Sequence, residues 1–295
     1  SLLCGERVSR QAVEERMVAE TSLFLKQVFE ETFKKKLHSG TPKAITRKFK
    51  HIKLEDSTVI NLPQDLSSSF PGNVSRGEKK SQLKIHVLYD FTKNDFDYMN
   101  VHSFTRNDQS LSKESIAHLN KGDLLLRDMG FLVLDAIDKI QAKQAYFISP
   151  KKYQIGLYDP KTKKEIDLIK ELSKHNFFDK EVLVGKQHLK MRLVVLALPE
   201  NITQQKRRKA HCDRDKRLNH TMEYYKLLGY NILLTNIPQS KCNAEQVSKL
   251  YGLRWQIEII FKSWKTGFSL EKLIPTKCIN PHRIYCMIYL WLTYI

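Results

Sequence analysis

Residues 251–265 read Y-G-L-R-W-Q-I-E-I-I-F-K-S-W-K. At the helical period of about 100° per residue, the side chains three, seven and fourteen positions after Tyr251 lie about 300°, 340° and 320° around the axis. These are Arg254, Glu258 and Lys265, which therefore share one face of a single predicted helix with Tyr251. The opposite face is apolar and consists of Leu250, Leu253, Ile257, Ile260, Phe261, Trp264 and Phe268. We expect that face to pack into a core while the polar stripe stays accessible.

The polar stripe combines one carboxylate with several cations. Glu258 lies among Arg254, Lys262 and Lys265, and the Tyr251 hydroxyl precedes the arginine by about one turn. A carboxylate can hold a metal ion while guanidinium and ammonium groups bind nearby phosphates. Ordinary pairing of Glu258 with Arg254 and Lys262 on a solvated face explains the stripe equally well. The stripe alone leaves both interpretations open.

The spacing of four residues in this helix resembles a known signature. Tyr251, Arg254, Glu258 and Lys265 match the YREK signature of the DDE transposases of the insertion-sequence-four family in residue type and spacing. The resemblance implies that Glu258 is the last of three catalytic carboxylates. It also implies that the other three residues bind phosphates near a transposon end, and that two catalytic aspartates precede them in the chain.

A first aspartate lies in a predicted strand at residues 51–62, where Asp56 is in line with the apolar side chains. An unpaired buried carboxylate is costly, so Asp56 needs a cation, a metal ion or hydrogen-bond donors. A strand-edge or turn aspartate bonded to Ser57 and Thr58 fits the pattern as well. The surrounding letters L-E-D-S-T-V-I resemble the first catalytic motif of the family, which implies that role for Asp56. Asp90, which ends a later predicted strand, is the second candidate.

A second aspartate, Asp128, ends a short predicted strand at residues 123–128 and precedes Gly130 by two positions. A carboxylate at the C-terminal end of an apolar strand lies at the sheet rim, where sites are built, although aspartate also ends strands as a turn residue. The letters D-M-G-F resemble the family motif D-R-G-(Y/F), with Met129 in place of arginine. The resemblance implies that Asp128 is the second metal ligand. We expect solvated side chains at Asp123, Asp135 and Asp138.

The order of predicted elements indicates an α/β fold. It runs strand, strand pair, helix, strand, helix, strand, at residues 51–62, 82–91 with 96–104, 110–119, 123–128, 132–143 and 145–149. This is the ribonuclease-H-like succession, a mixed sheet flanked by helices, and it resembles the catalytic core of the family. Residues 62–80, rich in Pro, Ser and Gly, read as a loop.

Four segments are expected along the chain. Residues 1–42 form a helical N-terminal segment, with one helix from Ser9 to about residue 37, and the resemblance makes it part of a module that binds transposon ends. Residues 45–150 form the first part of the ribonuclease-H-like core. The resemblance implies a largely β insertion at 151–241, and residues 242–295 complete the core with the glutamate helix, capped by Asn243, and the start of a C-terminal helix.

The predicted insertion contains the densest cationic block of the chain. Its members are Lys206, Arg207, Arg208, Lys209, Arg214, Lys216 and Arg217. A solvated helix face is the default interpretation, and contact of Arg207 and Arg208 with the DNA backbone is the functional alternative. On the glutamate helix, Trp255 is a candidate for stacking on an extruded base, whereas Trp264 on the apolar face is expected to pack in the core.

The overall composition favours a nucleic-acid partner. The 295 residues include 50 Lys and Arg against 32 Asp and Glu, a net charge of +18, which rewards contact with phosphates, although ribosomal or anionic-membrane proteins share such an excess. No apolar run is long enough to span a bilayer. Cys4, Cys212, Cys242, Cys278 and Cys286 are scattered and predict reduced thiols in a cytosolic protein. No P-loop, G-x-G-x-x-G or H-E-x-x-H motif is present.

We therefore expect a bacterial DDE transposase, located in the cytoplasm with the nucleoid. The resemblance implies that Asp56, Asp128 and Glu258 hold two Mg²⁺ ions, with Mn²⁺ as a substitute, about 3.5–4 Å apart. The expected partners are the terminal inverted repeats and target DNA, both double-stranded, and a second copy of the chain. Because the chain starts without Met and stops within an apolar run, we expect a piece of a longer protein. A metal-dependent nuclease of the same fold and a non-enzymatic DNA-binding remnant remain as alternatives.

Overall fold

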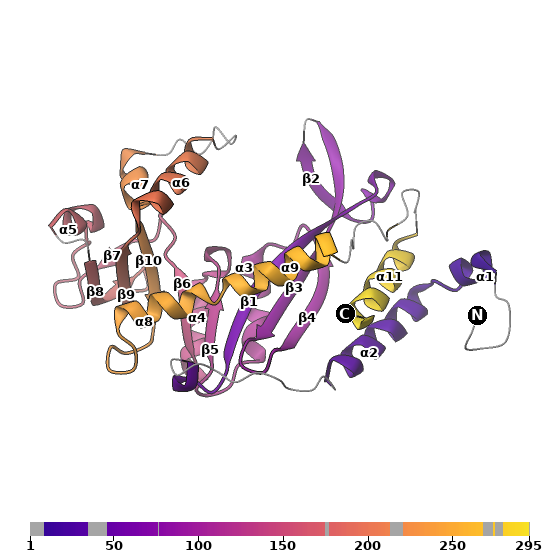
Figure 1. Ribbon diagram of the computed structural model, residues 1–295, viewed down its shortest axis with the longest axis horizontal. Coiled ribbons are helices and arrows are strands. Elements are labelled where there is room, and N and C mark those ends of the chain that lie inside the picture. Colours follow the sequence, from indigo (N-terminus) through magenta and orange to yellow (C-terminus); the bar gives the residue numbers. More distant parts are fainter. Residues whose placement is uncertain are drawn as a thin grey trace.

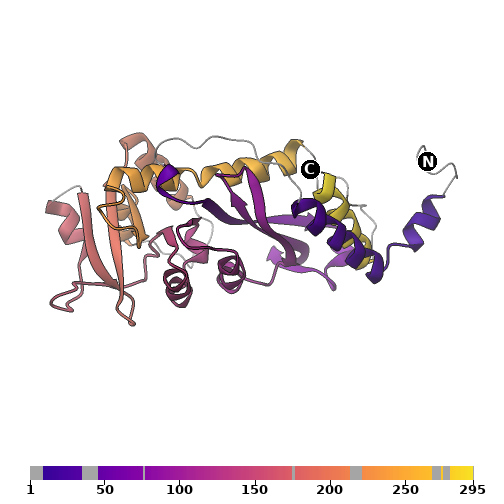
Figure 2. The same ribbon diagram turned by 90° about the horizontal axis from the view of Figure 1, so that it is seen from below.

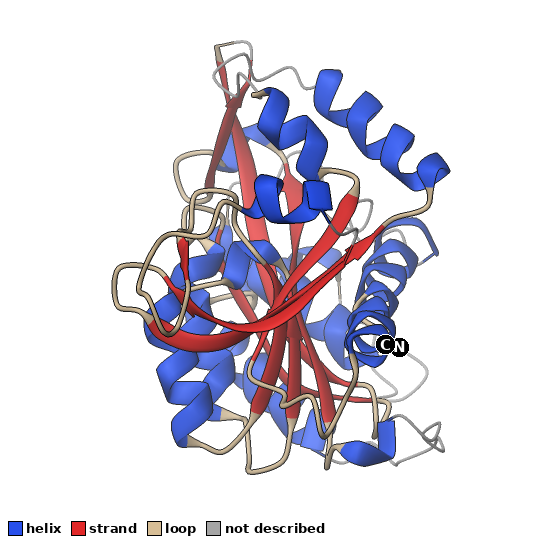
Figure 3. Ribbon diagram, turned by 90° about the vertical axis from the view of Figure 1, so that its left-hand side faces the viewer, coloured by secondary structure: helices blue, strands red, loops and turns tan. Residues whose placement is uncertain are grey.

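A mixed β-sheet runs through the centre of the molecule. The computed structural model describes residues 9–34, 46–75, 77–174, 177–212, 221–267, 274 and 280–294. Within these residues ten strands form one sheet in the order β2-β3-β1-β5-β6-β10-β9-β8-β7, with β4 paired to β3. The strands are β1 Ile52–Leu62, β2 Pro71–Ser75, β3 Glu78–Asp90, β4 Asp95–Ser103, β5 Leu124–Arg127, β6 Tyr146–Pro150, β7 Leu157–Tyr158, β8 Phe177–Val184, β9 Leu189–Ala197 and β10 Tyr230–Thr235. Figure 3 shows the twist of the sheet and the helices on both of its faces.

The first half of the sheet has the predicted ribonuclease-H-like pairing. β1 pairs antiparallel with β3, and β3 pairs antiparallel with β4. β1 is parallel to β5, and β5 is parallel to β6. Parallel neighbours bring their C-terminal ends to one edge of the sheet, so groups that follow β5 lie beside the middle of β1. The predicted fold class, an α/β mixed sheet flanked by helices, is confirmed.

Helices cover the two faces of the sheet. They are α1 Arg10–Glu15, α2 Ala19–Lys34, α3 Asp108–Ala117, α4 Leu134–Ala142, α5 Leu168–Lys174, α6 Glu200–His211, α7 Met222–Leu227, α8 Ala244–Gly252, α9 Trp255–Lys262 and α11 Pro281–Tyr294. α8 and α9 run across one face, while α3 and α4 lie on the other (Figures 1 and 2). None of the described helices is both long and apolar enough to cross a membrane.

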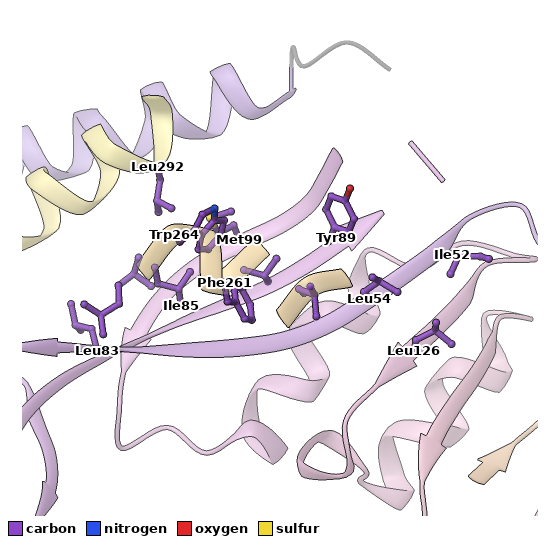
Figure 4. Close-up of a cluster of buried hydrophobic side chains, with 14 of the residues drawn as sticks. Ile52, Leu54, Leu83, Ile85, Tyr89, Met99, Leu126, Phe261, Trp264 and Leu292 are labelled. Atoms are coloured by element: carbon purple, nitrogen blue, oxygen red, sulfur yellow. The ribbon is translucent and has the colours of Figure 1, made fainter. Parts of the chain in front are cut away.

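The side chains of β1 alternate between the two faces of the sheet. Ile52, Leu54 and Ile60 are fully buried in the core that contains the apolar side of α8 and α9. Phe261 and Trp264 lie over β3, which carries Leu83 and Ile85 (Figure 4), as the apolar face of the glutamate helix predicts. Each fully buried side chain of this kind contributes about 1.5–3 kcal/mol relative to exposure. The same alternation directs the side chains between them, Lys53 and Glu55, to the opposite face.

The prediction of one continuous glutamate helix is wrong. The capping box of Asn243 and Gln246 begins α8 at the expected N-cap, but α8 ends at Gly252 and α9 starts at Trp255, after two intervening residues. Between them the Leu253 and Arg254 amides donate to carbonyls three residues earlier, which is a tight 3₁₀-type turn. A π-helical turn, Ser263–Gly267, then follows α9. Phe268, assigned to the apolar face, lies outside the described residues.

Three further expectations need correction. Residues 62–80 are not a loop throughout, since β2 forms a short edge strand there. β2 starts at Pro71, and proline, which has no amide hydrogen to donate, is tolerated at the first residue of an edge strand. The N-terminal helix, capped by Ser9 as predicted, is two helices, α1 and α2, separated by residues 16–18, and the stretch from residue 35 to 45 lies outside the described residues. Asp123 is fully buried against Lys53 rather than solvated.

The strands of residues 151–241 continue the core sheet. β10 pairs antiparallel with β6 on one side and with β9 on the other. β8 and β7 extend the same sheet to its edge, and α5, α6 and α7 gather at this end of the molecule (Figure 1). At the opposite end α11 packs against α2, with Phe29 and Tyr289 in contact. Of the cysteines in the described residues, Cys212, Cys242 and Cys286 are free thiols, as expected.

Candidate active site

Three carboxylates come together from three elements. Asp56 lies in the middle of β1, Asp128 directly follows β5, and Glu258 lies on the first turn of α9. The parallel register pairs Leu54 with Leu126 on β1 and β5, so the two aspartates occupy equivalent positions two residues further along. α9 packs on β1 and carries Glu258 to the same place. The arrangement brings together groups that are far apart in sequence.

Arg254 bridges two of these carboxylates. Its Nη1 donates to Oδ2 of Asp56 at 3.2 Å, and its Nη2 donates to Oε1 of Glu258 at 2.5 Å. The Tyr251 ring lies beside the guanidinium, 5.8 Å from ring centre to Cζ. Asp128 acts on both Asp56 and Tyr251 through its negative charge. One cation is thus shared within a group of three acids.

The electrostatics of the cluster favour an added positive charge. Burial, together with the negative charges of Asp128 and Glu258, raises the pKa of Asp56 to about 7, although the Ser57 amide and the Arg254 guanidinium act to lower it. Burial also raises the pKa of Tyr251 to about 12. Burial alone would lower the pKa of Arg254, but its phenolic and carboxylate neighbours raise it above its ordinary value. Arg254 therefore stays charged and only partly compensates the acids.

The donor set fits a divalent cation. Three carboxylates provide an all-oxygen site, the type that Mg²⁺ and Mn²⁺ prefer. Asp56 and Glu258 are 18% and 33% exposed, so a cation can enter from solvent. The position between them is already taken by a positively charged group, Arg254. The residues present thus suit the metal that the sequence resemblance implies.

The loop after β5 explains the glycine of the D-M-G-F motif. Asp128 caps the short 3₁₀ turn that follows it by accepting from the Gly130 amide at 3.4 Å. A Cβ on Gly130 would lie 3.1 Å from Oδ2 of Asp108, a carboxylate held by hydrogen bonds from Ser57 and Lys84. This close approach favours glycine at position 130. Met129, which replaces the arginine of the family motif, is 44% exposed.

Other residues predicted for the site lie apart from the carboxylates. Trp255 is 61% exposed at the start of α9, and Lys262 and Lys265 are exposed further along. Within the described residues no hydrogen bond or ion pair links these two lysines to the three acids. Arg207 and Arg208 are exposed on α6 in the extended half of the sheet. The remaining members of the cationic block, Arg214, Lys216 and Arg217, lie outside the described residues.

Asp90, the alternative first aspartate, has a different setting. It pairs with Lys53 in the register of β1 and β3, away from Asp56. Its carboxylate accepts from the amides of Thr92 and Lys93 and contacts His51 at 3.1 Å. These are the bonds of an aspartate that stabilises a hairpin turn.

A second group of potential metal ligands lies under α3. His86, His102 and Glu114 each offer a ligand atom within 4.8 Å of the others. Arg106, however, donates to Nδ1 of His102 at 2.9 Å, which places the ring proton on the nitrogen that faces Glu114. Burial lowers the pKa of His102 to about 4, so the ring is neutral. Arg106 and Glu114 thus occupy both ring nitrogens of His102, which identifies a hydrogen-bond network between β4 and α3.

Sequence reasoning missed the polar residues packed beneath the aspartates. Glu55 and Arg127 directly precede Asp56 and Asp128, and both are fully buried. Burial would raise the pKa of Glu55, but Arg127 and His86 hold it below its ordinary value. The signal available was a charged residue directly before each of the two aspartates, Glu55 before Asp56 and Arg127 before Asp128.

Fold and site together define a class: a ribonuclease-H-like α/β domain with a carboxylate cluster beside the C-terminal end of β5. The family model described as "Transposase DDE domain" matches residues 48–294. The chain therefore belongs to the DDE transposase family, and its YREK residues place it in the insertion-sequence-four group.

Curated relatives cover almost the whole chain. The transposase for insertion sequence element IS231B of Bacillus thuringiensis subsp. berliner is 29% identical over 97% of this chain and 64% of its own length. The transposase for insertion sequence element IS1151 of Clostridium perfringens is 25% identical over 98% of this chain and 65% of its own length. The chain thus spans a little under two thirds of these relatives. A solved structure of Ciona intestinalis endonuclease V with DNA has a TM-score of only 0.29 at 11% identity, covering 78% of this chain and 88% of that one, too low to bear on function.

Proposed function

We propose that this chain is the catalytic part of an insertion-sequence transposase that cleaves DNA at transposon ends and joins those ends to target DNA. The observation that carries the proposal is the convergence of Asp56, Asp128 and Glu258 at one place, where Arg254 binds Asp56 and Glu258 and the negative charge of Asp128 acts on Asp56. The names of the curated relatives, all insertion-sequence transposases, support the same activity.

Asp56, Asp128 and Glu258 would hold Mg²⁺, or Mn²⁺ in its place, and two ions would be held in all. When bound, such ions lower the pKa of an attacking water or hydroxyl and stabilise the leaving oxygen. The protein groups hold the DNA: Arg254 would turn from the carboxylates to a phosphate, and Tyr251 and Lys265 would contact the same strand. The net charge of +18 supports attraction of the DNA to this surface.

The proposal extends to the segments of the chain and to its assembly. Residues 45–150 and 242–295 would form the catalytic core, with 151–241 as an insertion subdomain and 1–42 as part of an end-binding module. Trp255 would stack on an extruded base, and Lys262, Arg207 and Arg208 would contact the DNA backbone. A homodimer would bring two transposon ends together before joining.

The test uses three substitutions that keep shape and remove charge: Asp56→Asn, Asp128→Asn and Glu258→Gln. The substrate is a supercoiled plasmid that carries the DNA flanking the gene on both sides. Each variant is expected to lose Mn²⁺-dependent cleavage by at least about a hundredfold, since a metal ligand is removed, while gel-shift binding of the same DNA persists. Asp135→Asn on the exposed side of α4 serves as the matched control and is expected to cleave normally.

Full cleavage by any of the three variants would remove that residue from the proposed site. Joining is assayed separately, by capture of the cut ends in a second plasmid. Cleavage without joining would assign the chain to a metal-dependent nuclease instead.

A further inference from the structure

A buried ion pair lies directly behind the two aspartates. Arg127 Nε donates to Glu55 Oε2 at 2.8 Å, and Nη2 donates to the same oxygen at 2.5 Å. Both side chains are fully buried. Glu55 and Arg127 are direct partners in the parallel pairing of β1 with β5, and each precedes one of the aspartates. Because strand side chains alternate, the pair lies on one face of the sheet and the aspartates on the other.

The ion pair is fixed by two further elements. From α3, Ser115 donates its hydroxyl to Glu55, and Ser112 accepts from Arg127 Nη2 at 2.8 Å. From β3, Nε2 of His86 lies 3.2 Å from Glu55 Oε1. Four elements, β1, β5, β3 and α3, therefore meet at this pair. Such a network holds each side chain in one orientation.

The ion pair lies at the last residue pair of the β1–β5 pairing, next to the two aspartates. The pairing of β1 with β5 ends at Glu55 and Arg127, so no strand pairing fixes Asp128 relative to Asp56. The ion pair is the last contact between the two strands before the carboxylates. Buried ion pairs add little net stability compared with apolar side chains of similar volume, so stability alone does not account for its presence here.

We propose that Glu55 and Arg127 are positioning residues that set the separation of Asp56 and Asp128 for cation binding. The inference rests on the proposed function, in which these aspartates hold a divalent ion. A change in the pair moves the strand ends, and with them two ligands of one site. Partners behind metal ligands typically alter metal affinity by about 10- to 100-fold when they are changed.

The same two strands provide a matched control. Lys53 Nζ contacts Asp123 Oδ2 at 3.2 Å, and these side chains are 2% and 0% exposed. This second buried pair lies on the same face as Glu55 and Arg127 but at the opposite end of the β1–β5 pairing. Disturbing it perturbs the fold in a similar way without acting on the ends that carry the aspartates.

The experiment measures Mn²⁺ affinity by calorimetry on the full chain without DNA. Arg127→Lys and Glu55→Asp keep every charge but disrupt the two hydrogen bonds from Arg127 to Glu55 Oε2, so a purely electrostatic role predicts no change for either. We expect each to weaken Mn²⁺ binding about tenfold. Asp123→Glu, the corresponding charge-conserving change in the control pair, is expected to retain the affinity of the unmodified chain. Circular dichroism identifies the variants that are folded. Either Arg127→Lys or Glu55→Asp alone suffices for the comparison with Asp123→Glu.

The Asp56→Asn variant, measured in the same titration, distinguishes failure of the proposed metal site from failure of the positioning role. If it binds Mn²⁺ like the unmodified chain, the proposed site is wrong and the positioning role falls with it. If it loses Mn²⁺ but Arg127→Lys and Glu55→Asp bind no more weakly than Asp123→Glu, the positioning role alone is overturned. Weakening confined to Arg127→Lys and Glu55→Asp supports it.

Discussion

At the scale of single residues, the motifs predicted which acids to examine but not what holds them. Asp56 was placed on the apolar side of a strand from alternation alone, and the structure places it there beside α9. For Arg254, helical spacing allows a pair with Glu258 and the resemblance implies a phosphate contact. The structure shows the pair with Glu258 and a second bond to Asp56, 198 positions away, which no local pattern indicates. Glu55 and Arg127 escaped notice because charged residues in strands usually face solvent.

The raised pKa of Asp56 predicts how stability depends on pH. In the unfolded chain this carboxyl titrates near 3.8, and in the folded chain near 7. Between these values the folded state binds more protons, so stability falls as pH rises through this window. Asp56→Asn removes the buried charge and should raise the free energy of unfolding at pH 8 by on the order of 2–4 kcal/mol.

At pH 4 the same substitution should change stability little, because Asp56 is then largely protonated in the folded state. Urea titrations at the two pH values measure the difference. An equal effect of Asp56→Asn at pH 4 and pH 8 would show that the carboxyl does not titrate in this range.

At the scale of elements, periodicity gave the correct apolar face of the glutamate helix but missed its interruption. Arg254 lies in the turn between α8 and α9 with φ −54° and ψ −29°. These angles are close to those of a regular helix, so side chains on either side keep their faces. The turn depends on which carbonyl each amide selects, and the hydrophobic pattern carries no information on that choice. β2 was missed for another reason, since Pro71 and Gly72 are poor strand formers.

Arg254 at this turn predicts opposite effects on two ligands. Arg254→Ala removes a cation that occupies the space between Asp56 and Glu258, so Mn²⁺ should bind more tightly, by about threefold to tenfold, to the DNA-free chain. The same change should weaken binding of transposon-end DNA, because the proposed phosphate contact of Arg254 is lost. Calorimetry and gel shift measure the two affinities, with Lys262→Ala as a control that should leave Mn²⁺ binding unchanged. Weaker Mn²⁺ binding by Arg254→Ala would mean that the arginine supports the metal site instead of competing for it.

At the scale of the whole molecule, the order of the core elements was predictable and the extent of the sheet was not. Local patterns identified β8, β9 and β10, but the pairing of β10 with β6, which joins these strands to the core, links residues about 80 positions apart. Pairing between strands so far apart in sequence depends on three-dimensional packing, which a short stretch of sequence does not indicate. The division into a core and an insertion at residues 151–241 accordingly remains a proposal.

The surface charge predicts the salt dependence of DNA binding. Arg207 and Arg208 are exposed on α6, and the chain as a whole is strongly basic. If both arginines contact phosphates, the double variant Arg207→Gln, Arg208→Gln should lower affinity and reduce the slope of log K against log salt by about 2. Lys161→Gln with Lys163→Gln, an equal charge change on an exposed turn, is the control. If both double variants reduce the slope of log K against log salt equally, DNA is attracted by the overall positive charge and does not contact Arg207 and Arg208 specifically.

The continuity of the sheet has a mechanical consequence. β10 is hydrogen-bonded to β6 along one edge and to β9 along the other, so the backbone forms an uninterrupted plate from α6 at one end to the catalytic strands. A load applied to the far end of this plate cannot be absorbed by a hinge inside it. If DNA is bound at α6 as proposed, tension from a bent duplex there would pass through β10 and β6 to β5 and reach Asp128.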